Sequence, residues 1–493
     1  MDLKDHITGY VRKNSAMALF FFVLSICIFG VYLSHDIVTF DAEGFYTAGC
    51  EAKWYGQWLE LGRWGLVILK KLTGLTFINP YFSAAIFFLC IPLGVVLWTV
   101  LLSYWMPAVP SYAAWIFGAV FLSHPVWALQ FAYRNQMECI SFLLMIMPMA
   151  LLLYSDWLKN KNNISLIISF ALMIFLFGSY QAFEFVGACG LLIILFLYLH
   201  QDEEKLVTAK EFAITIGYLA GAFVISMIIA MFLQMRYDIH GGSYLSEQFL
   251  WGKQSISENI AAIFNYMNAG FIGNHVEYGP LYLILTILAC ISVFLHEKNR
   301  VPRLIVLAGI VLMPFVLTMV TASEIVSRSQ FSYVLAIAFL AWYCCASLVK
   351  VKYIPLLLCA VFAVQQAEIS TRLLYTHVRV MEEDKDRFRL IWQEALEKGA
   401  EEGDALCLIG GMSNTVDDTM LEREVIGYSY FEHTEFYGPS KTAEAMSAYG
   451  YHVSEPSKEQ LAEAERIARE MNLWPHGEDG IRVQDHMIIV RLK

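Results

Sequence analysis

Charged residues are scarce in this sequence of 493 residues. Asp, Glu, Lys and Arg together make up 16% of the chain, whereas about 25% is usual for soluble proteins. Hydrophobic residues make up 58%, and the mean hydropathy is +0.53. This composition excludes a disordered chain and a nucleic-acid-binding protein, and it argues against a wholly soluble enzyme.

The sequence also lacks a cysteine framework and the common metal and nucleotide motifs. Most of its 10 cysteines lie in apolar stretches, where Cys acts as a small apolar side chain. Cys and His are not spaced as in metal sites. The stretch Gly410-Gly411-Met412-Ser413 has neither the Walker pattern nor the G-x-G-x-x-G spacing. We therefore expect no metal, no cofactor and no nucleotide.

The few charges are unevenly distributed along the chain. From Arg372 to the end there are 24 acidic and 14 basic residues, a net charge of −10, which leaves −1 of the total −11 for the first 371 residues. Predicted strands at 405–412 and 487–490 and predicted helices at 380–400 and 457–471 follow the last apolar run. The sequence therefore predicts an apolar domain, 1–371, and a small acidic α/β domain, 372–493.

Apolar runs of about 18 to 22 residues are long enough to cross a bilayer as helices. The first 371 residues contain eleven runs that we predict to be spans, which makes the chain an α-helical polytopic membrane protein with the lipid bilayer as a partner. They lie at 16–33, 82–102, 112–130, 138–154, 164–180, 183–199, 212–233, 280–295, 304–322, 331–349 and 354–371.

Basic residues in the short connections set the expected orientation, since Lys and Arg favour the cytoplasmic side. With a cytoplasmic N-terminus, the cytoplasmic connections include 159–162, 200–211, 296–303 and 350–352, and each contains Lys or Arg. Two long loops, 34–81 and 234–279, and the acidic domain then face the extracytoplasmic side. We expect the functional site to lie there.

The first of these loops begins with three carboxylates within eight residues, Asp36, Asp41 and Glu43. Acids at a membrane surface are costly and are often functional. One of them can act as a general base in a half-dry pocket, although an ordinary solvated loop would also contain such residues. Further along, Trp54 and Trp58 share a helical face, which predicts an amphipathic helix with its Trp side chains at headgroup depth.

Cations and polar groups near the same predicted surface complete a set of candidate site residues. Arg63, Arg134 and Arg328 are candidates for binding a phosphate group, and the alternative is that they anchor the chain to lipid phosphates. Hydroxyl and amide groups suit sugar recognition, but they also join helices by hydrogen bonds. The candidate sugar or acceptor contacts are Tyr180, Gln181, Glu184 and Trp64.

Four short stretches in this order resemble the GtrII-type bacterial glucosyltransferases, and the resemblance covers most of the chain. The first differs from that family's usual paired aspartates, because Ala42 separates an Asp from a Glu, so the base is open among Asp36, Asp41 and Glu43. The stretches are Asp41-Ala42-Glu43, Gly62-Arg63-Trp64-Gly65, Ser179-Tyr180-Gln181-Ala182 and the tail from Leu473 to Leu492.

The resemblance implies a GT-C fold in a bacterial plasma (inner) membrane. Such enzymes take a sugar, here expected to be glucose, from polyprenyl phosphate and invert its anomeric centre. The acceptor would be a glycan of the cell surface, and a carboxylate of the first loop would be the base. The alternative function is a transporter or a flippase for lipid-linked sugars. It predicts charges deep within the spans and two similar halves, which the sequence does not show.

Overall fold

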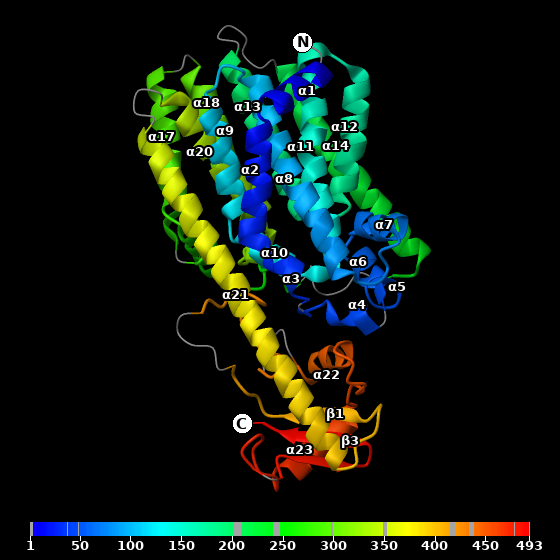
Figure 1. The fold of residues 1–493 in the computed structure, drawn as a ribbon. Coiled ribbons are helices and arrows are strands. Elements are labelled where there is room, and N and C mark those ends of the chain that lie inside the picture. Colours follow the sequence, from blue (N-terminus) through cyan, green and yellow to red (C-terminus); the bar gives the residue numbers. More distant parts are fainter. Residues whose placement is uncertain are drawn as a thin grey trace.

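The protein consists of a helical bundle with a smaller body at one end, joined by one long helix (Figure 1). The computed structural model describes residues 3–36, 38–47, 49–201, 209–239, 247–273, 275–296, 299–348, 353–414, 420–432, 438–477 and 479–492. Parts of three predicted cytoplasmic connections, 202–208, 297–298 and 349–352, lie outside the described residues. The N-terminus lies at the bundle end opposite the smaller body.

Mostly apolar helices make up the bundle, because a helix satisfies its backbone polar groups internally. In chain order these helices are α1 (Leu3–Lys13), α2 (Ser15–Phe29), α8 (Pro80–Trp105), α9 (Ser111–Ser123), α10 (Val126–Ala132), η1 (Arg134–Gln136), α11 (Met137–Asn160), α12 (Asn163–Phe177), α13 (Ala182–Gln201), α14 (Ala209–Arg236), α17 (Leu281–His296), α18 (Arg300–Leu312), η3 (Met313–Phe315), α19 (Val316–Thr321), α20 (Phe331–Ser347) and α21 (Tyr353–Glu397).

Several of these helices are suited to a membrane. Among the described residues, 6 helices are long and apolar enough to cross it, or up to 8 if the bent pairs α1–α2 and α9–α10 each count as one span. Helices α12, α17 and α20 are apolar but shorter. All eleven predicted runs overlap these helices, and the number of spans stays a prediction. Exposed apolar residues of α14, such as Ile228 and Phe232, point to a lipid-facing surface.

The segment between α2 and α8 folds back against the bundle as five short helices. They are α3 (Val31–Ser34), α4 (Glu43–Thr47), α5 (Gly49–Lys53), α6 (Tyr55–Glu60) and α7 (Trp64–Thr73). The prediction of one amphipathic helix here is wrong, since Gly62 has φ +75° and separates α6 from α7. Trp54 and Trp58 are buried against Phe45, with ring centroids 5.7 and 5.9 Å away, and their depth in the membrane stays a prediction.

A buried ion pair joins this segment to the bundle. Lys70 of α7 contacts Glu138 of α11, and both side chains are almost fully buried. Ser83 of α8 donates a hydrogen bond of 2.9 Å to the same carboxylate. The second long connection contains α16 (Ile256–Asn268) and the π-helical turn η2 (Ala269–Gly273), and the short turn η4 (Ser327–Ser329) precedes α20.

After the bundle, α21 continues without a break across the predicted boundary at residue 372. The C-terminal region that follows contains β1 (Ala405–Ile409), α22 (Pro439–Ala448), α23 (Lys458–Ala468), β2 (Ile481–Gln484) and β3 (Met487–Arg491). The sheet order is β1-β3-β2, with β3 parallel to β1 and antiparallel to β2. β1, α23 and β3 lie where the sequence predicted a strand, a helix and a strand, whereas α22 and β2 were not predicted.

Alternation along the strands gives the sheet two buried faces. Leu406 and Ile488 pack with Phe388 of α21, while Cys407 and Ile489 pack with Ile467 of α23. Because successive strand residues point to opposite faces, one strand contributes to both clusters. The end of α21 is therefore part of this body, which fixes the C-terminal region to the bundle.

We predict that Lys70→Met lowers the free energy of unfolding by about 3–5 kcal/mol, because it leaves the Glu138 carboxylate buried without its cation. The double variant Lys70→Met/Glu138→Leu should recover most of this loss. Denaturant unfolding in detergent micelles measures both. Equal destabilisation in the single and double variants would contradict the ion-pair explanation.

Candidate functional site

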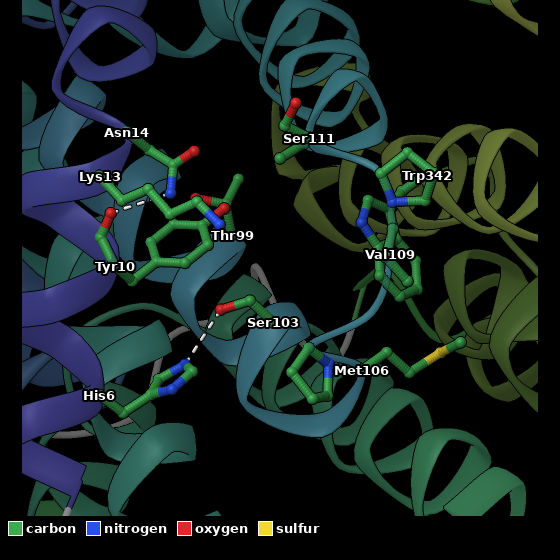
Figure 2. Close-up of a pocket in the computed structure, with 13 residues that line it drawn as sticks. His6, Tyr10, Lys13, Asn14, Thr99, Ser103, Met106, Val109, Ser111 and Trp342 are labelled. Atoms are coloured by element: carbon green, nitrogen blue, oxygen red, sulfur yellow. Dashed lines mark hydrogen bonds between the residues drawn. The ribbon is translucent and has the colours of Figure 1, made fainter.

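A polar pocket lies at the bundle end that carries the N-terminus (Figure 2). It has a volume of about 260 Å³ and lies between α1, α8, α9 and α20. His6 and Ser103 join across it at 3.0 Å, and Lys13 lines its rim. None of its lining residues is an acid, so it offers no carboxylate base. The predicted acids lie at the other end of the bundle, beside the C-terminal region.

Two of the three predicted acids meet one lysine of the C-terminal region. Lys441 Nζ lies 2.8 Å from Glu43 Oε1 and 3.5 Å from Asp41 Oδ1. Glu43 begins α4, Lys441 is in the first turn of α22, and these two helices pack together (Figure 1). Asp41 has φ +67°, a left-handed conformation that Asp adopts more readily than most residues. This turn brings both carboxylates to the same ammonium group.

The two carboxylates differ in burial. The Glu43 side chain is 0% exposed, whereas that of Asp41 is 26% exposed. Burial raises the pKa of Glu43 to about 7, although Lys441 acts in the opposite direction. Burial also raises the pKa of Asp41, against the lowering effect of Lys441 and Arg328. Burial would lower the pKa of Lys441, but Glu43 and Asp41 outweigh it and raise that pKa.

Arg328, whose charge acts on Asp41, already has an anionic partner. Its backbone N–H and its Nη1 donate to the two oxygens of Glu424 at 3.0 and 2.9 Å. Its guanidinium carbon lies 4.5 Å from the centroid of the Tyr133 ring. Burial would lower the pKa of Arg328, but the neighbouring Tyr133 and Glu424 raise it. Arg328 is thus a well-defined anion site.

Arg63 lies in a cluster built from two of the stretches that carried the resemblance. Its Nε donates to Gln181 Oε1 at 3.0 Å, and its guanidinium stacks 4.6 Å from the Tyr180 ring centroid. Gln181 donates to the backbone oxygen of Leu61 at 2.5 Å. The Gly65 N–H donates to the Gly178 oxygen at 2.7 Å. Residues more than 100 positions apart therefore form one structural unit.

Aromatic rings link the acids to this cluster. The edge of Phe40 meets Tyr133 with centroids 6.4 Å apart, and the charge of Arg328 acts on both Asp41 and Tyr180. The structure thus brings Asp41, Glu43, Arg328, Tyr180, Gln181 and Arg63 to one end of the bundle.

Asp36 and Arg134 belong to a different neighbourhood. Asp36 accepts a hydrogen bond of 2.5 Å from Tyr46. Arg134 is buried, stacks 4.6 Å from the centroid of Tyr32, and donates to the Pro80 oxygen at 3.3 Å. The pKa of Tyr46 is raised by burial and by Asp36, and lowered by Arg134. No contact of Asp36 or Arg134 with the Asp41 group occurs among the described residues, and their roles stay predictions.

The last two predicted residues differ in their surroundings. Trp64 is buried, its Nε1 donates to the Ser226 oxygen at 3.3 Å, and its ring packs on Phe175. This contact positions α7 against the hairpin between α12 and α13. Glu184 is partly exposed in the first turn of α13, one turn after Tyr180. Their contacts with a sugar stay predictions.

Sequence reasoning missed the partners from the C-terminal region. Lys441 and Glu424 are 400 and 96 residues from Asp41 and Arg328, and neither lies in a recognisable motif. Arg423 beside them donates to Glu277 Oε1 at 2.8 Å and to Ser327 at 2.9 Å. The signal that could have found them is the acidic loop itself, because buried carboxylates need cations. Across the described ranges, no three His, Cys, Asp or Glu side chains group as metal ligands.

Comparison with family models decides the classification. The model of the glucosyl transferase GtrII family matches residues 30–345. The chain belongs to the GtrII glucosyltransferase family. The matched range contains all the predicted site residues and ends before Glu424 and Lys441. Comparisons with curated proteins and with solved structures found no match.

We predict that Gly178→Ala destabilises this GtrII family member by about 1–3 kcal/mol, as overpacking does. A Cβ at residue 178 would lie 2.0 Å from the Trp64 indole. Gly217→Ala is the control, because a Cβ there meets nothing within 4 Å and Ala favours a helix over Gly. Thermal unfolding in micelles compares them. If Gly178→Ala were as stable as Gly217→Ala, the close contact with Trp64 would not matter.

Proposed function

We propose that this glucosyltransferase is an integral protein of the bacterial plasma membrane. It takes glucose from a polyprenyl phosphate and transfers it, with inversion, to a cell-surface polysaccharide. The observation that carries the proposal is the part-exposed Asp41 carboxylate, on which the charge of the Arg328 guanidinium acts. A base for a hydroxyl group and a cation for a phosphate are the two groups that this chemistry needs.

Asp41 is the better candidate for the base. A general base must come within hydrogen-bond distance of the acceptor hydroxyl, and only Asp41 of the Lys441-bound pair has an exposed face. Its left-handed backbone is a conformation that costs energy and is frequent at functional sites. Glu43 is closed off and is better suited to holding Lys441.

The transfer needs one bond to form and one to break. The acceptor oxygen attacks C1 of glucose from the face opposite the phosphate, and Asp41 takes the hydroxyl proton. The bond from C1 to the phosphate oxygen breaks, and its electron pair leaves with the polyprenyl phosphate. Arg328 stabilises the charge that develops on this leaving group, as a paired guanidinium does for phosphates.

The cluster around Arg63 suits the sugar. The Tyr180 ring is covered by Arg63, and Gln181 is held by Arg63 and Leu61, so these groups are preorganised. Glu184, four residues after Tyr180, adds a carboxyl group that can form hydrogen bonds with sugar hydroxyls. Arg63 is the second candidate for the phosphate.

The proposed topology places this site outside the cell. The N-terminus is cytoplasmic, and the C-terminal region lies at the other end of the bundle with the acids (Figure 1). A flipped lipid-linked donor and a surface polysaccharide meet on that side. We propose that no metal and no other cofactor takes part.

We predict that Asp41→Asn lowers the rate of glucose transfer by a factor of about 10²–10⁴, the usual contribution of a general base. The assay follows label from polyprenyl-phosphate glucose to polysaccharide extract in reconstituted membranes. Asp386→Asn changes an exposed acid of α21 and should leave the rate unchanged. An active Asp41→Asn would move the base to Glu43 or Asp36, and label that crosses the bilayer without transfer would favour a flippase.

We predict opposite effects from the two partners at the anion site. Arg328→Gln should raise the donor KM about tenfold or more, since it removes a charge-assisted hydrogen bond. Glu424→Gln should lower the donor KM, because the phosphate then no longer competes with a resident carboxylate for Arg328. Exposed Glu422→Gln is the control. A rise in KM for Glu424→Gln would show that Glu424 positions Arg328 instead of competing for it.

A further inference from the structure

Lys441 comes from the C-terminal region but sits within the candidate site. Its ammonium group lies 3.5 Å or less from carboxylate oxygens of Asp41, Glu43 and Glu444. We infer that Lys441 is a positioning residue of the transfer reaction: with Glu43 as its buried anchor, it holds the Asp41 carboxylate toward the acceptor. This inference rests on the proposed function, because it takes Asp41 as the base.

The surroundings of Lys441 restrict it to this position. Its Nζ lies 5.2 Å from the centroid of Phe40 and 5.7 Å from that of Trp54, which are cation–π distances. Its helix is fixed by Thr442, which donates to the Tyr430 oxygen at 2.7 Å. The ammonium group therefore lies against two rings of the first connecting segment and close to three carboxylates.

The division of roles follows from burial. Glu43 is closed to solvent, so its ion pair with Lys441 is not in contact with an acceptor. Asp41 is at the longer distance and keeps an exposed face. Because Lys441 contacts Oδ1 of Asp41, it holds this carboxylate in place and leaves the other oxygen, Oδ2, available. The arrangement resembles the oriented base of other group-transfer sites, where a third group holds the base.

Lys441 is not needed merely to dock the C-terminal region. Asp384 of α21 accepts from Ser429 Oγ at 2.6 Å and from the Tyr430 N–H at 2.8 Å. Arg423 and Glu424 make their own contacts with Glu277 and Arg328. These contacts hold the region without Lys441, so its ammonium group can be removed while the fold is kept.

A pH profile separates positioning from a structural role. Asp41 interacts with Lys441, Arg328, Glu444, Glu43 and Tyr133. Glu43 interacts with Lys441 and Asp41. Both acids lose their nearest cation in Lys441→Met, so the pKa of Asp41 rises. Activity that needs ionised Asp41 then appears only at higher pH. Loss of an opposite charge at this distance shifts a carboxyl pKa by about 1–3 units.

The experiment measures the rate of glucose transfer against pH for the full-length protein and three variants. Lys441→Met should move the acid limb by about one pH unit or more to higher pH, so that activity lost at the acidic end of the native profile is regained as the pH rises. Lys441→Arg keeps the charge and should keep the limb. Lys458→Met removes an exposed lysine of α23 and should match the native profile. Equal loss at every pH, or no change, would overturn the inference.

A second readout does not depend on transfer. Water-soluble carbodiimide modifies protonated carboxyl groups, and peptide mass spectrometry reports the modification of Asp41 at each pH. Lys441→Met should extend this modification to higher pH. If the native protein transfers no glucose but this shift occurs, the proposed function fails and the pairing of Lys441 with Asp41 stands. If transfer occurs without the shift, the inference alone fails.

Discussion

The structure depends on how charge is neutralised at the end of an apolar bundle. A carboxylate or ammonium group taken out of water costs several kcal/mol unless a partner and hydrogen bonds compensate it. At this end, Lys70 pairs with Glu138, Lys441 with Glu43, and Arg328 with Glu424. In each pair the two residues come from different elements. Neutralisation therefore also fixes how the first connecting segment, the bundle and the C-terminal region sit together.

The long helix α21 makes this arrangement feasible. It leaves the bundle as an apolar helix and ends as part of the core of the C-terminal region, with Phe388 and Ile391 buried there. Asp384 lies on the same helix, accepts hydrogen bonds from the turn at 429–430, and has a pKa that burial raises to about 7. A continuous helix transmits a fixed distance and rotation. It therefore holds α22 against α4, which places Lys441 beside Asp41 and Glu43.

Much of this fold could be predicted because local pattern decides it. All eleven apolar runs overlap helices, and the turn at 178–181 lies where two predicted spans touched. The segment around Trp54 and Trp58 was predicted as part of one helix, but Gly62, with φ +75°, divides it into α6 and α7. The spacing of apolar residues along a helix does not say whether its apolar face contacts lipid or the rest of the protein. The packing of Trp54 on Phe45 and the left-handed conformation of Gly62 appear only in the folded chain.

The site could be predicted only in part, for a similar reason. The acids and arginines are visible in the sequence because charge is rare there, but their pairing is a property of the folded chain. Asp41 and Glu43 are two positions apart, so on an extended strand their side chains would lie on the same face. Here a left-handed Asp41 precedes the first turn of α4, and a single lysine still reaches both. Burial makes the two acids unequal, since Glu43 is closed to solvent and Asp41 keeps an exposed face. An unequal pair needs only one cation, and Lys441 supplies it.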